Sequence, residues 1–404
     1  MKEVVCLCLV RYRNMASAGI LSSKQRLYLI VFGFGFLLAH LLAAVRLERK
    51  ETIFHSDEVE RVLVSYAYAE GLGNGGKIDR YNLHFFIRVA LAGNAPGTMD
   101  FAKKVDYVFV VNGWNCEPCE SSLKQVLSSE ESKKRGKEWI TVLYRNNTGM
   151  DIGAHNASIS WAKKRRPGKY QYFIFLNSSA RGPFMPKWTP SNFHFTDVLT
   201  QFLRENRRIK IAGSYISCLS GKLEQDDRIV METLFFCLDS ESLNWAVADG
   251  IFNIYDEKYL TALLGEYALL NSIFKRGGMA EGLSMRYSKN LDWADGSHSS
   301  CNDNRHSSRR GNLEGGLSPN LLENIFVKAS WCVRAAESAI LSRWLLKLSD
   351  GYAGTEGISD QTGWEYGSSP QGTSSKNGTL KPDIPVDGCQ FGNIDDLRVE
   401  SFGF

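Results

Sequence analysis

Hydrophobic positions along this chain form short, nearly continuous runs that alternate with segments of helical spacing. The continuous runs occupy residues 61–70, 105–113, 139–147 and 170–178. They are rich in β-branched and aromatic residues, which is typical of buried strands. Segments with apolar residues three and four positions apart, typical of helices, occupy residues 80–93, 119–135 and 151–164. This alternation predicts an α/β, Rossmann-like fold with a mostly parallel sheet flanked by helices.

The same alternation continues through the second half of the chain. Strand-like runs cover residues 208–218 and 230–239, and the second of them ends in Asp239. Residues 295–316 are polar and rich in Ser, Arg and Gly, which indicates a loop. Helical spacing returns at residues 195–206, 241–252, 257–278 and 319–348. We therefore expect one folded domain over residues 61–347.

Residues 27–45 are apolar on every face, and basic residues stand on both sides of them. As a helix they would span roughly 28 Å, close to the thickness of the hydrocarbon core of a bilayer. The run predicts one N-terminal transmembrane helix that acts as an uncleaved signal anchor. A cleaved signal peptide is the main alternative, because Ala43 and Ala44 close the run. A buried core helix is a weaker one, because such a helix has a polar face.

The other segments complete the predicted organisation. Residues 1–26 form a tail before the anchor, and residues 46–60 form a short polar stem. Residues 348–404 are rich in Gly and Ser and poor in aromatic residues. A segment of that composition buries too little apolar surface to fold alone, so we expect disorder there.

Charge and cysteine content narrow the class of protein only slightly. The net charge is +4 and the basic residues are scattered, which argues against nucleic acid as the main partner. Cys116 and Cys119 form a lone CEPC, for which a local disulfide or two free thiols are favoured over a metal or redox site. His155 and His194 lack the spacing of metal ligands. Sequons that would permit a luminal domain occur at Asn146, Asn156, Asn177 and Asn377.

Residues 145–184 hold the most informative chemistry. A turn rich in Asn and Gly opens the helix at 151–164, and the apolar strand at 170–178 runs into a polar tip. A diphosphate needs backbone N–H groups at a helix start, a cation to offset its charge, and short polar side chains. Ligands of such sheets bind beyond the carboxyl ends of the strands. We therefore expect a phosphate-binding site at these two tips.

Two sequence elements carry a resemblance to a known family. The first, Asn-x-Gly-x-Asp-x-Gly, is present as Asn147, Gly149, Asp151 and Gly153. The second, Asn-[Asp/Ser]-Ser-x-x-Gly-Pro-Phe, is present as Asn177, Ser178, Ser179, Arg181, Gly182, Pro183 and Phe184. In this arrangement the segment resembles the donor-binding half of GT-A glycosyltransferases. It resembles most closely the rhamnan-synthesis F type and its eukaryotic membrane-anchored relatives, over residues 62–329.

The resemblance implies a GT-A-like fold and a glycosyltransferase. Such an enzyme would move a sugar from a nucleoside-diphosphate sugar to the hydroxyl of a carbohydrate acceptor. It also implies a single-pass type II membrane protein of the Golgi or endoplasmic reticulum, held through residues 27–45, with its catalytic domain in the lumen. The donor would contact Asn147, Gly149, Asp151, Gly153, Asn177, Ser178 and Arg181.

The acids and the metal of this predicted site are less well defined. Glu281, expected in a loop, and Asp239 are the candidates for the acid that assists the acceptor hydroxyl. Many GT-A enzymes carry Asp-x-Asp where this chain has Asn177, Ser178 and Ser179. A Mn²⁺ or Mg²⁺ ion would therefore depend on Asp151, Asp239 or the phosphates alone.

Each candidate residue also has a purely structural interpretation. Asp151 and Asp239 are placed to cap helices. Asn177 and Ser178 are placed to cap a turn, and Arg181 can brace its own loop. For the whole chain, the alternatives are a non-catalytic relative that binds a sugar nucleotide or a glycan, and an unrelated membrane-tethered scaffold.

Overall fold

The computed structural model describes residues 60–70, 76–91, 95–98, 104–135, 138–218, 229–284, 291–295, 320–331 and 333–349. Every described residue belongs to one compact unit, Glu60–Phe404. The predicted tail and anchor, nearly all of the stem and of the polar loop, and the C-terminal segment from residue 350 lie outside the described residues. No described helix is both long and apolar enough to cross a membrane.

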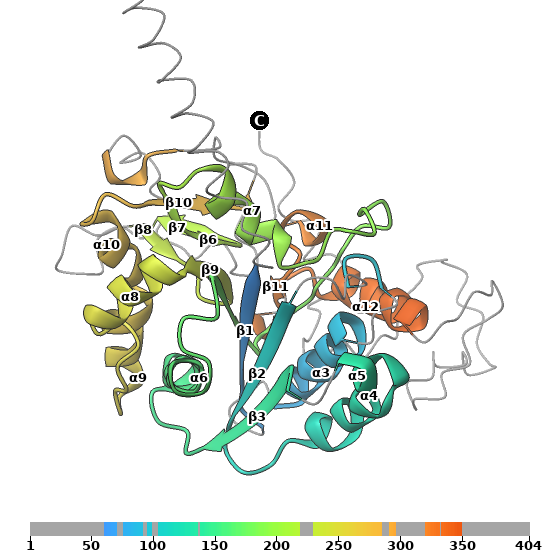
Figure 1. Cartoon of the computed structure of the whole chain (residues 1–404). Coiled ribbons are helices and arrows are strands. Elements are labelled where there is room, and N and C mark those ends of the chain that lie inside the picture. Colours follow the sequence, from blue (N-terminus) through green and yellow to red (C-terminus); the bar gives the residue numbers. More distant parts are fainter. Residues whose placement is uncertain are drawn as a thin grey trace, which may run out of the picture. The chain divides into compact units, whose positions relative to one another are not determined.

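A seven-stranded sheet forms the centre of the described domain (Figure 1), in the order β10-β6-β9-β4-β1-β2-β3. Six strands run in one direction, and β9 is antiparallel to both of its neighbours. The predicted α/β fold with a mostly parallel sheet is confirmed. The strands are β1 (Arg61–Tyr68), β2 (Lys104–Asn112), β3 (Ile140–Arg145), β4 (Tyr172–Asn177), β6 (Ile209–Gly213), β9 (Phe235–Asp239) and β10 (Met279–Gly282).

Helices cover both faces of the sheet (Figure 1). One face packs against α3 (Gly76–Phe86) with its π-helical extension η2 (Ile87–Leu91), α4 (Lys124–Ser128) and α7 (Asp197–Glu205). The other face packs against α6 (Met150–Arg165), α8 (Ser240–Ala248) and α10 (Leu269–Phe274). The remaining helical elements are η3 (Cys119–Leu123), α5 (Glu130–Arg135), α9 (Lys258–Leu260), η4 (Thr261–Glu266), η5 (Trp293–Asp295), α11 (Leu321–Asn324), η6 (Ala329–Trp331) and α12 (Ala335–Ser349).

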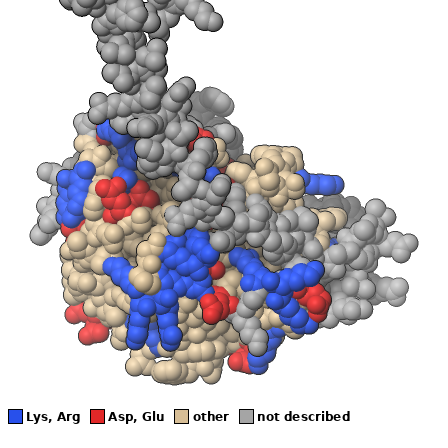
Figure 2. Space-filling view, in the orientation of Figure 1, with Lys and Arg blue, Asp and Glu red and all other residues tan. Residues whose placement is uncertain are grey.

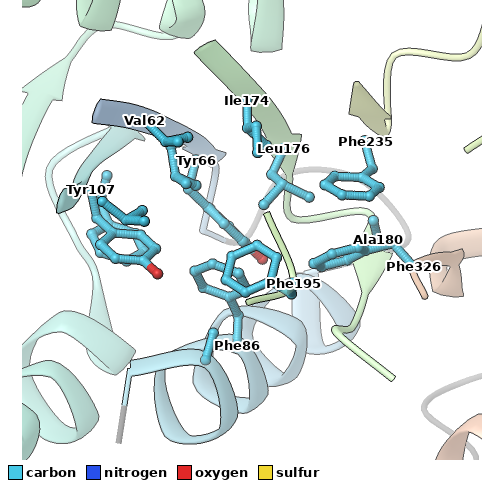
Figure 3. Packing of buried hydrophobic residues seen from close by; sticks show 14 of the residues in the cluster. Val62, Tyr66, Phe86, Tyr107, Ile174, Leu176, Ala180, Phe195, Phe235 and Phe326 are labelled. Carbon is cyan, nitrogen blue, oxygen red and sulfur yellow. The ribbon is translucent and has the colours of Figure 1, made fainter. Parts of the chain in front are cut away.

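The alternation of side chains along β1 produces two hydrophobic cores. Val62, Val64 and Tyr66 point to the face that α3 covers, whereas Leu63 and Ala67 point to the face that α6 covers. Figure 3 shows the first core, where aromatic rings from the sheet and from α3 pack together. Each fully buried large apolar side chain contributes roughly 1.5–3 kcal/mol. Because both faces are buried, the strands read as continuous apolar runs in the sequence.

Two predicted strands are interrupted at the carboxyl edge of the sheet. The run at 208–218 forms β6 and then β7 (Ile216–Cys218), and the run at 230–239 forms β8 (Ile229–Met231) and then β9. β7 and β8 pair with each other in a separate two-stranded sheet. Each break is only two or three residues long, Ser214 and Tyr215 in the first run and Glu232 to Leu234 in the second, so the apolar residues on either side predict one strand.

The predicted helices exist, but several are divided. The segment 257–278 forms α9, η4 and α10, and the segment 119–135 forms η3, α4 and α5. The loop expected around Glu281 is wrong, because this residue belongs to β10 and pairs with Ala212 of β6. Gly277 and Gly278 mark the turn before that strand rather than a loop that includes the acid.

Candidate functional site

The sheet reverses its strand order beside β1, and this position defines the candidate site. From β1 the chain proceeds to β2 and β3 on one side, whereas β4 lies on the other side. Ala67 near the end of β1 pairs with Asn177 at the end of β4. In open α/β sheets such a reversal creates a ligand-binding crevice beyond the carboxyl ends of the strands. The two predicted tips follow β3 and β4 at this same carboxyl edge.

Arg145 and Asn112 fix the turn between β3 and α6. Arg145 donates from Nη1 to Asn112 Oδ1 over 2.6 Å and from Nη2 to the carbonyl oxygen of Thr148 over 2.6 Å. Asn112 in turn donates from Nδ2 to the carbonyl oxygen of Met150 over 2.9 Å. Sequence reasoning missed Asn112, although it is the polar residue that ends an apolar strand. Its contacts hold the first turn of α6 against the ends of two strands.

Two glycines of the first sequence element are required by backbone geometry. Gly149 has a φ of +66°, in the left-handed region that favours glycine. A Cβ atom on Gly153 would lie 2.3 Å from the carbonyl oxygen of Thr148 and about 3 Å from the Arg145 guanidinium. The turn therefore packs directly against the helix backbone. Asn147, the first residue of the element, is exposed in this turn.

A hydrogen bond joins the two predicted elements. Asn177 Nδ2 donates to Asp151 Oδ2 over 2.9 Å. The Asn177 Oδ1 atom accepts from the backbone N–H of Ser179 over 3.2 Å and also from the Ser179 hydroxyl. The sequence predicted that these segments meet, and the side chains of Asp151 and Asn177 make that contact. Asn177 also forms the turn that was its structural alternative.

Arg181 lies beneath the turn at the end of β4, residues 177–179, which we call the tip. It is almost completely buried, with 1% of its surface exposed. Its Nε donates to Asn82 Oδ1 over 2.8 Å, and its guanidinium lies over the Tyr81 ring at 4.5 Å. Asn82 Nδ2 donates to the carbonyl oxygen of Ser178 over 2.7 Å. Of the two interpretations of Arg181, these contacts favour the structural one. Asn82 could not be recognised from the sequence as a site residue, because it lies among the apolar positions of a helix.

A short antiparallel pair connects the tip to the end of the domain. β5 (Ala180–Arg181) pairs with β11 (Val327–Lys328), and the N–H of Ser330 donates to the carbonyl oxygen of Ser179 over 3.2 Å. Phe326, just before β11, packs against Phe235 with ring centroids 4.4 Å apart (Figure 3). This pairing brings residues 177–184 and 326–330, which are far apart in the chain, into direct contact.

Gly182 leaves room for the segment that precedes β11. Its φ is +159°, and a Cβ atom there would lie 2.3 Å from the carbonyl oxygen of Ile325. The N–H of Phe184 donates to that same oxygen over 2.8 Å. The peptide bond between Gly182 and Pro183 is cis. The Gly-Pro-Phe part of the second element therefore has a structural role in packing two distant segments.

Asp79 and Lys328 place opposite charges near the tip. Asp79 lies in the first turn of α3, and burial raises the pKa of its carboxyl to about 6, while the Lys328 ammonium opposes this increase. The Lys328 Nζ atom lies 4.7 Å from the centre of the Trp331 ring. Neither residue was a candidate, because the sequence placed Asp79 before the helix and Lys328 outside the tip.

The CEPC segment forms a disulfide between Cys116 and Cys119, with Cα atoms 5.2 Å apart. It follows β2 directly and lies next to the exposed Trp114. Glu117 between the cysteines donates from its N–H to Glu70 Oε2 over 2.9 Å. Of the interpretations left open by the sequence, the structure selects the local disulfide. The bond stiffens a second loop at the carboxyl edge.

His155 belongs to the core on the α6 side. It is fully buried, its Nδ1 lies 2.9 Å from the Ser65 hydroxyl, and its ring packs on Phe175. Burial lowers the pKa of its imidazole to about 4. His194 is likewise buried, with Nδ1 2.8 Å from the Thr196 hydroxyl. Both histidines have the structural roles that their isolated positions indicated.

The structure does not bring Asp239 to the candidate site. Because β9 runs antiparallel, Asp239 pairs with Tyr172 at the start of β4, which is the opposite edge of the sheet from Asn177. Its Oδ1 accepts from the N–H of Ser242 over 2.7 Å and so caps α8, and its Oδ2 accepts from Lys210 Nζ over 2.9 Å. The helix cap was the alternative interpretation of this residue, and the contacts match it.

Glu281 lies at the carboxyl edge but three strands away from β4. Glu281 pairs with Ala212 of β6, and Ala212 pairs with Cys237 of β9. Cys237 in turn pairs with Ile174 of β4. A spacing of about 4.8 Å between strands separates Glu281 from β4 by roughly 14 Å. Its surface is 5% exposed. Glu281 therefore lies at the carboxyl edge but is separate from the two sequence elements at residues 147–153 and 177–184.

Sequence reasoning missed two further acids at this edge. Glu232 lies in the turn between β8 and β9, is 3% exposed, and accepts from the Ser217 hydroxyl over 2.6 Å. Glu266, at the end of η4, accepts from the Thr233 hydroxyl over 2.8 Å. The division of the predicted strand 230–239 into two strands places this turn at the carboxyl edge.

The residues at the tip do not form a set of metal ligands. Within the described parts of the chain, no group of three or more His, Cys, Asp or Glu side chains is arranged to hold a metal ion. At the end of β4, Asp151 supplies a single carboxylate, and Asn177 already donates to it. A site for Mn²⁺ or Mg²⁺ usually collects several oxygen ligands. The residues therefore fit a divalent metal poorly.

Comparison with known proteins identifies no relative. No protein-family model and no curated protein matches this chain. The fold and the contacts of the carboxyl edge are therefore the basis for any functional conclusion.

Proposed function

We propose that this protein is a glycosyltransferase that uses a nucleoside-diphosphate sugar as donor and a carbohydrate hydroxyl as acceptor. The observation that carries the proposal is the hydrogen bond between Asn177 and Asp151. It joins the two sequence elements that resemble the donor-binding half of GT-A glycosyltransferases, at the reversal point of an α/β sheet. Two elements that match a family separately and also meet in space support the family more strongly than either alone.

In this proposal the donor diphosphate lies over the start of α6 and the end of β4, which the hydrogen bond between Asp151 and Asn177 joins. The N-terminus of α6 lies at this position, where the helix dipole favours a negatively charged group. Ser178 and Ser179 add hydroxyl groups at the end of β4. Asp151 keeps Asn177 in position, and Arg181 holds the tip from the interior.

We assign the acceptor to the half of the edge formed by β9, β6 and β10. A sugar diphosphate that lies along the edge extends from β4 toward Glu281, which stays our proposed base for the acceptor hydroxyl. Asp239 is no longer part of this proposal, because it lies at the other edge of the sheet. We propose a luminal, membrane-anchored setting, and the disulfide of Cys116 and Cys119 supports an oxidising compartment.

Donor hydrolysis by the purified full-length protein tests this function. A panel of nucleotide sugars is screened for release of nucleoside diphosphate, with and without Mn²⁺. We expect release from one donor, reduced roughly tenfold or more by Asn177→Ala or Asp151→Ala, because a hydrogen bond to a charged group at the site is lost. Asp239→Ala is the matched control and should retain activity.

The non-catalytic alternative has its own outcome in this experiment. Binding of a donor without release, with every acceptor in a carbohydrate panel, would identify a sugar-nucleotide-binding relative. A folded protein that neither binds nor cleaves any donor would refute the proposed function.

A further inference from the structure

One positive charge near the end of β4 comes from a segment far away in the sequence, β11. β11 pairs with β5 directly after the tip, with Lys328 opposite Ala180. The N–H of Ser330 donates to the carbonyl oxygen of Ser179 over 3.2 Å. The backbone on both sides of Lys328 is thus held to the residues that follow Asn177, by the pairing of Val327 with Arg181 and by the hydrogen bond from Ser330. A movement of the tip would carry the lysine with it.

The environment of Lys328 leaves its charge available. Its Nζ atom lies 4.7 Å from the Trp331 ring centre, and the described residues provide no carboxylate within 4.0 Å of it. Asp79 acts on it only through a longer electrostatic interaction. By contrast, Lys210 at the amino edge contacts Asp239 at 2.9 Å and Glu241 at 2.6 Å. A lysine supported by an aromatic ring keeps its N–H donors for an anion.

A diphosphate bound at the end of β4 would need a cation beside it. A diphosphate carries more than one negative charge, and neutral amides and hydroxyls alone do not offset it. The end of β4 lacks the carboxylates that would collect a divalent metal, and the buried guanidinium of Arg181 is directed to Asn82 and Tyr81. Lys328 is the described basic side chain that is both joined to the tip and partly exposed.

We propose that Lys328 binds the diphosphate of the nucleotide donor and supplies the positive charge that a divalent metal provides in Asp-x-Asp enzymes. This inference rests on the proposed function and specifies how its donor site works. It follows that nucleoside diphosphates bind without added metal.

Equilibrium binding of UDP and GDP to the full-length protein tests this role, with titrations in EDTA and in Mn²⁺. We expect the nucleotide to bind in EDTA with a dissociation constant within about threefold of that in Mn²⁺. Lys328→Met should weaken binding in EDTA by roughly tenfold or more, as loss of one charge-assisted contact does. Lys328→Arg keeps the charge and should restore most of the affinity.

Lys347→Met is the matched control, because Lys347 also lies over a tryptophan, Trp344, at 5.9 Å, but on α12. It should bind like the unsubstituted protein, and thermal unfolding of each variant checks the fold. Binding that requires Mn²⁺, or a Lys328→Met variant that binds normally in EDTA, would overturn the role of Lys328 and leave the proposed function intact. No binding of either nucleotide under any condition would overturn both.

Discussion

The two edges of the central sheet carry different kinds of polar contact. At the amino edge the groups are charged and paired: Lys210 contacts Asp239 and Glu241, and Arg166 contacts Asp106 at 3.1 Å. Basic side chains also gather around α6 in Figure 2, and the last turn of that helix carries Lys163, Lys164 and Arg165. At the carboxyl edge, amides, hydroxyls and backbone groups make the contacts around Asn177.

This difference shows that an acid at a strand end does not by itself mark a site. Asp151 and Asp239 both stand where a strand or turn passes into a helix. Asp239 caps its own helix and binds a lysine, so its charge is already compensated. Asp151 instead accepts from an amide on the neighbouring strand end. The direction of one strand, β9, decides which acid is near the donor elements.

Among variants that distinguish the two edges, we expect the largest loss of stability and of donor binding for Gly153→Ala at the carboxyl edge. The added Cβ would lie 2.3 Å from the carbonyl oxygen of Thr148, so the turn or α6 must shift. We expect a loss of about 2–3 kcal/mol in the free energy of unfolding, as for overpacking of a core, together with loss of donor binding. Urea denaturation and nucleotide titration measure the two effects.

The control for this variant is Gly282→Ala at the end of β10, where an added Cβ would meet its nearest neighbour at 3.5 Å, an ordinary contact. It should change the free energy of unfolding by less than about 1 kcal/mol. If Gly153→Ala were as stable as this control, the tight turn described above would be wrong.

A smaller effect, restricted to stability, is expected for Asp239→Ala. This change removes the cap of α8, which costs about 1 kcal/mol, and it removes one of the two carboxylates at Lys210. Thermal unfolding should show the loss, whereas donor binding should stay unchanged. Glu241→Gln, at the exposed partner of the same lysine, should have little effect on either. A loss of donor binding in Asp239→Ala would contradict the separation of the two edges.

The last effect concerns the pH dependence of stability that Asp79 causes at the carboxyl edge. Burial raises the pKa of its carboxyl to about 6, above the value of about 4 for an unfolded chain. Between about pH 4 and pH 6 the folded state therefore binds more protons, and its stability falls as the pH rises. Asp79→Asn should remove this part of the pH profile, and it should be more stable at pH 7 by up to about 3 kcal/mol, since each pKa unit corresponds to about 1.4 kcal/mol. Urea denaturation of both proteins between about pH 4 and pH 7 measures this dependence. Identical pH profiles for the two proteins would disprove the raised pKa of Asp79.

Much of the fold could be predicted because most elements are local. Strands β1, β2 and β4 are buried on both faces, so their apolar runs mark them directly in the sequence. The divided strands 208–218 and 230–239 were missed because β7 and β8 are just as apolar as the strands beside them.

The sequence by itself determined the alternation of strands and helices and the residues of the two donor elements, since burial patterns and motifs are recorded in neighbouring positions. Only the tertiary structure decided that Asp239 faces the other edge, that Arg181 is buried against Asn82, and that Lys328 joins the tip. The physical reason is that strand direction and the pairing of β5 with β11 depend on contacts between residues far apart in the chain, which no local pattern encodes.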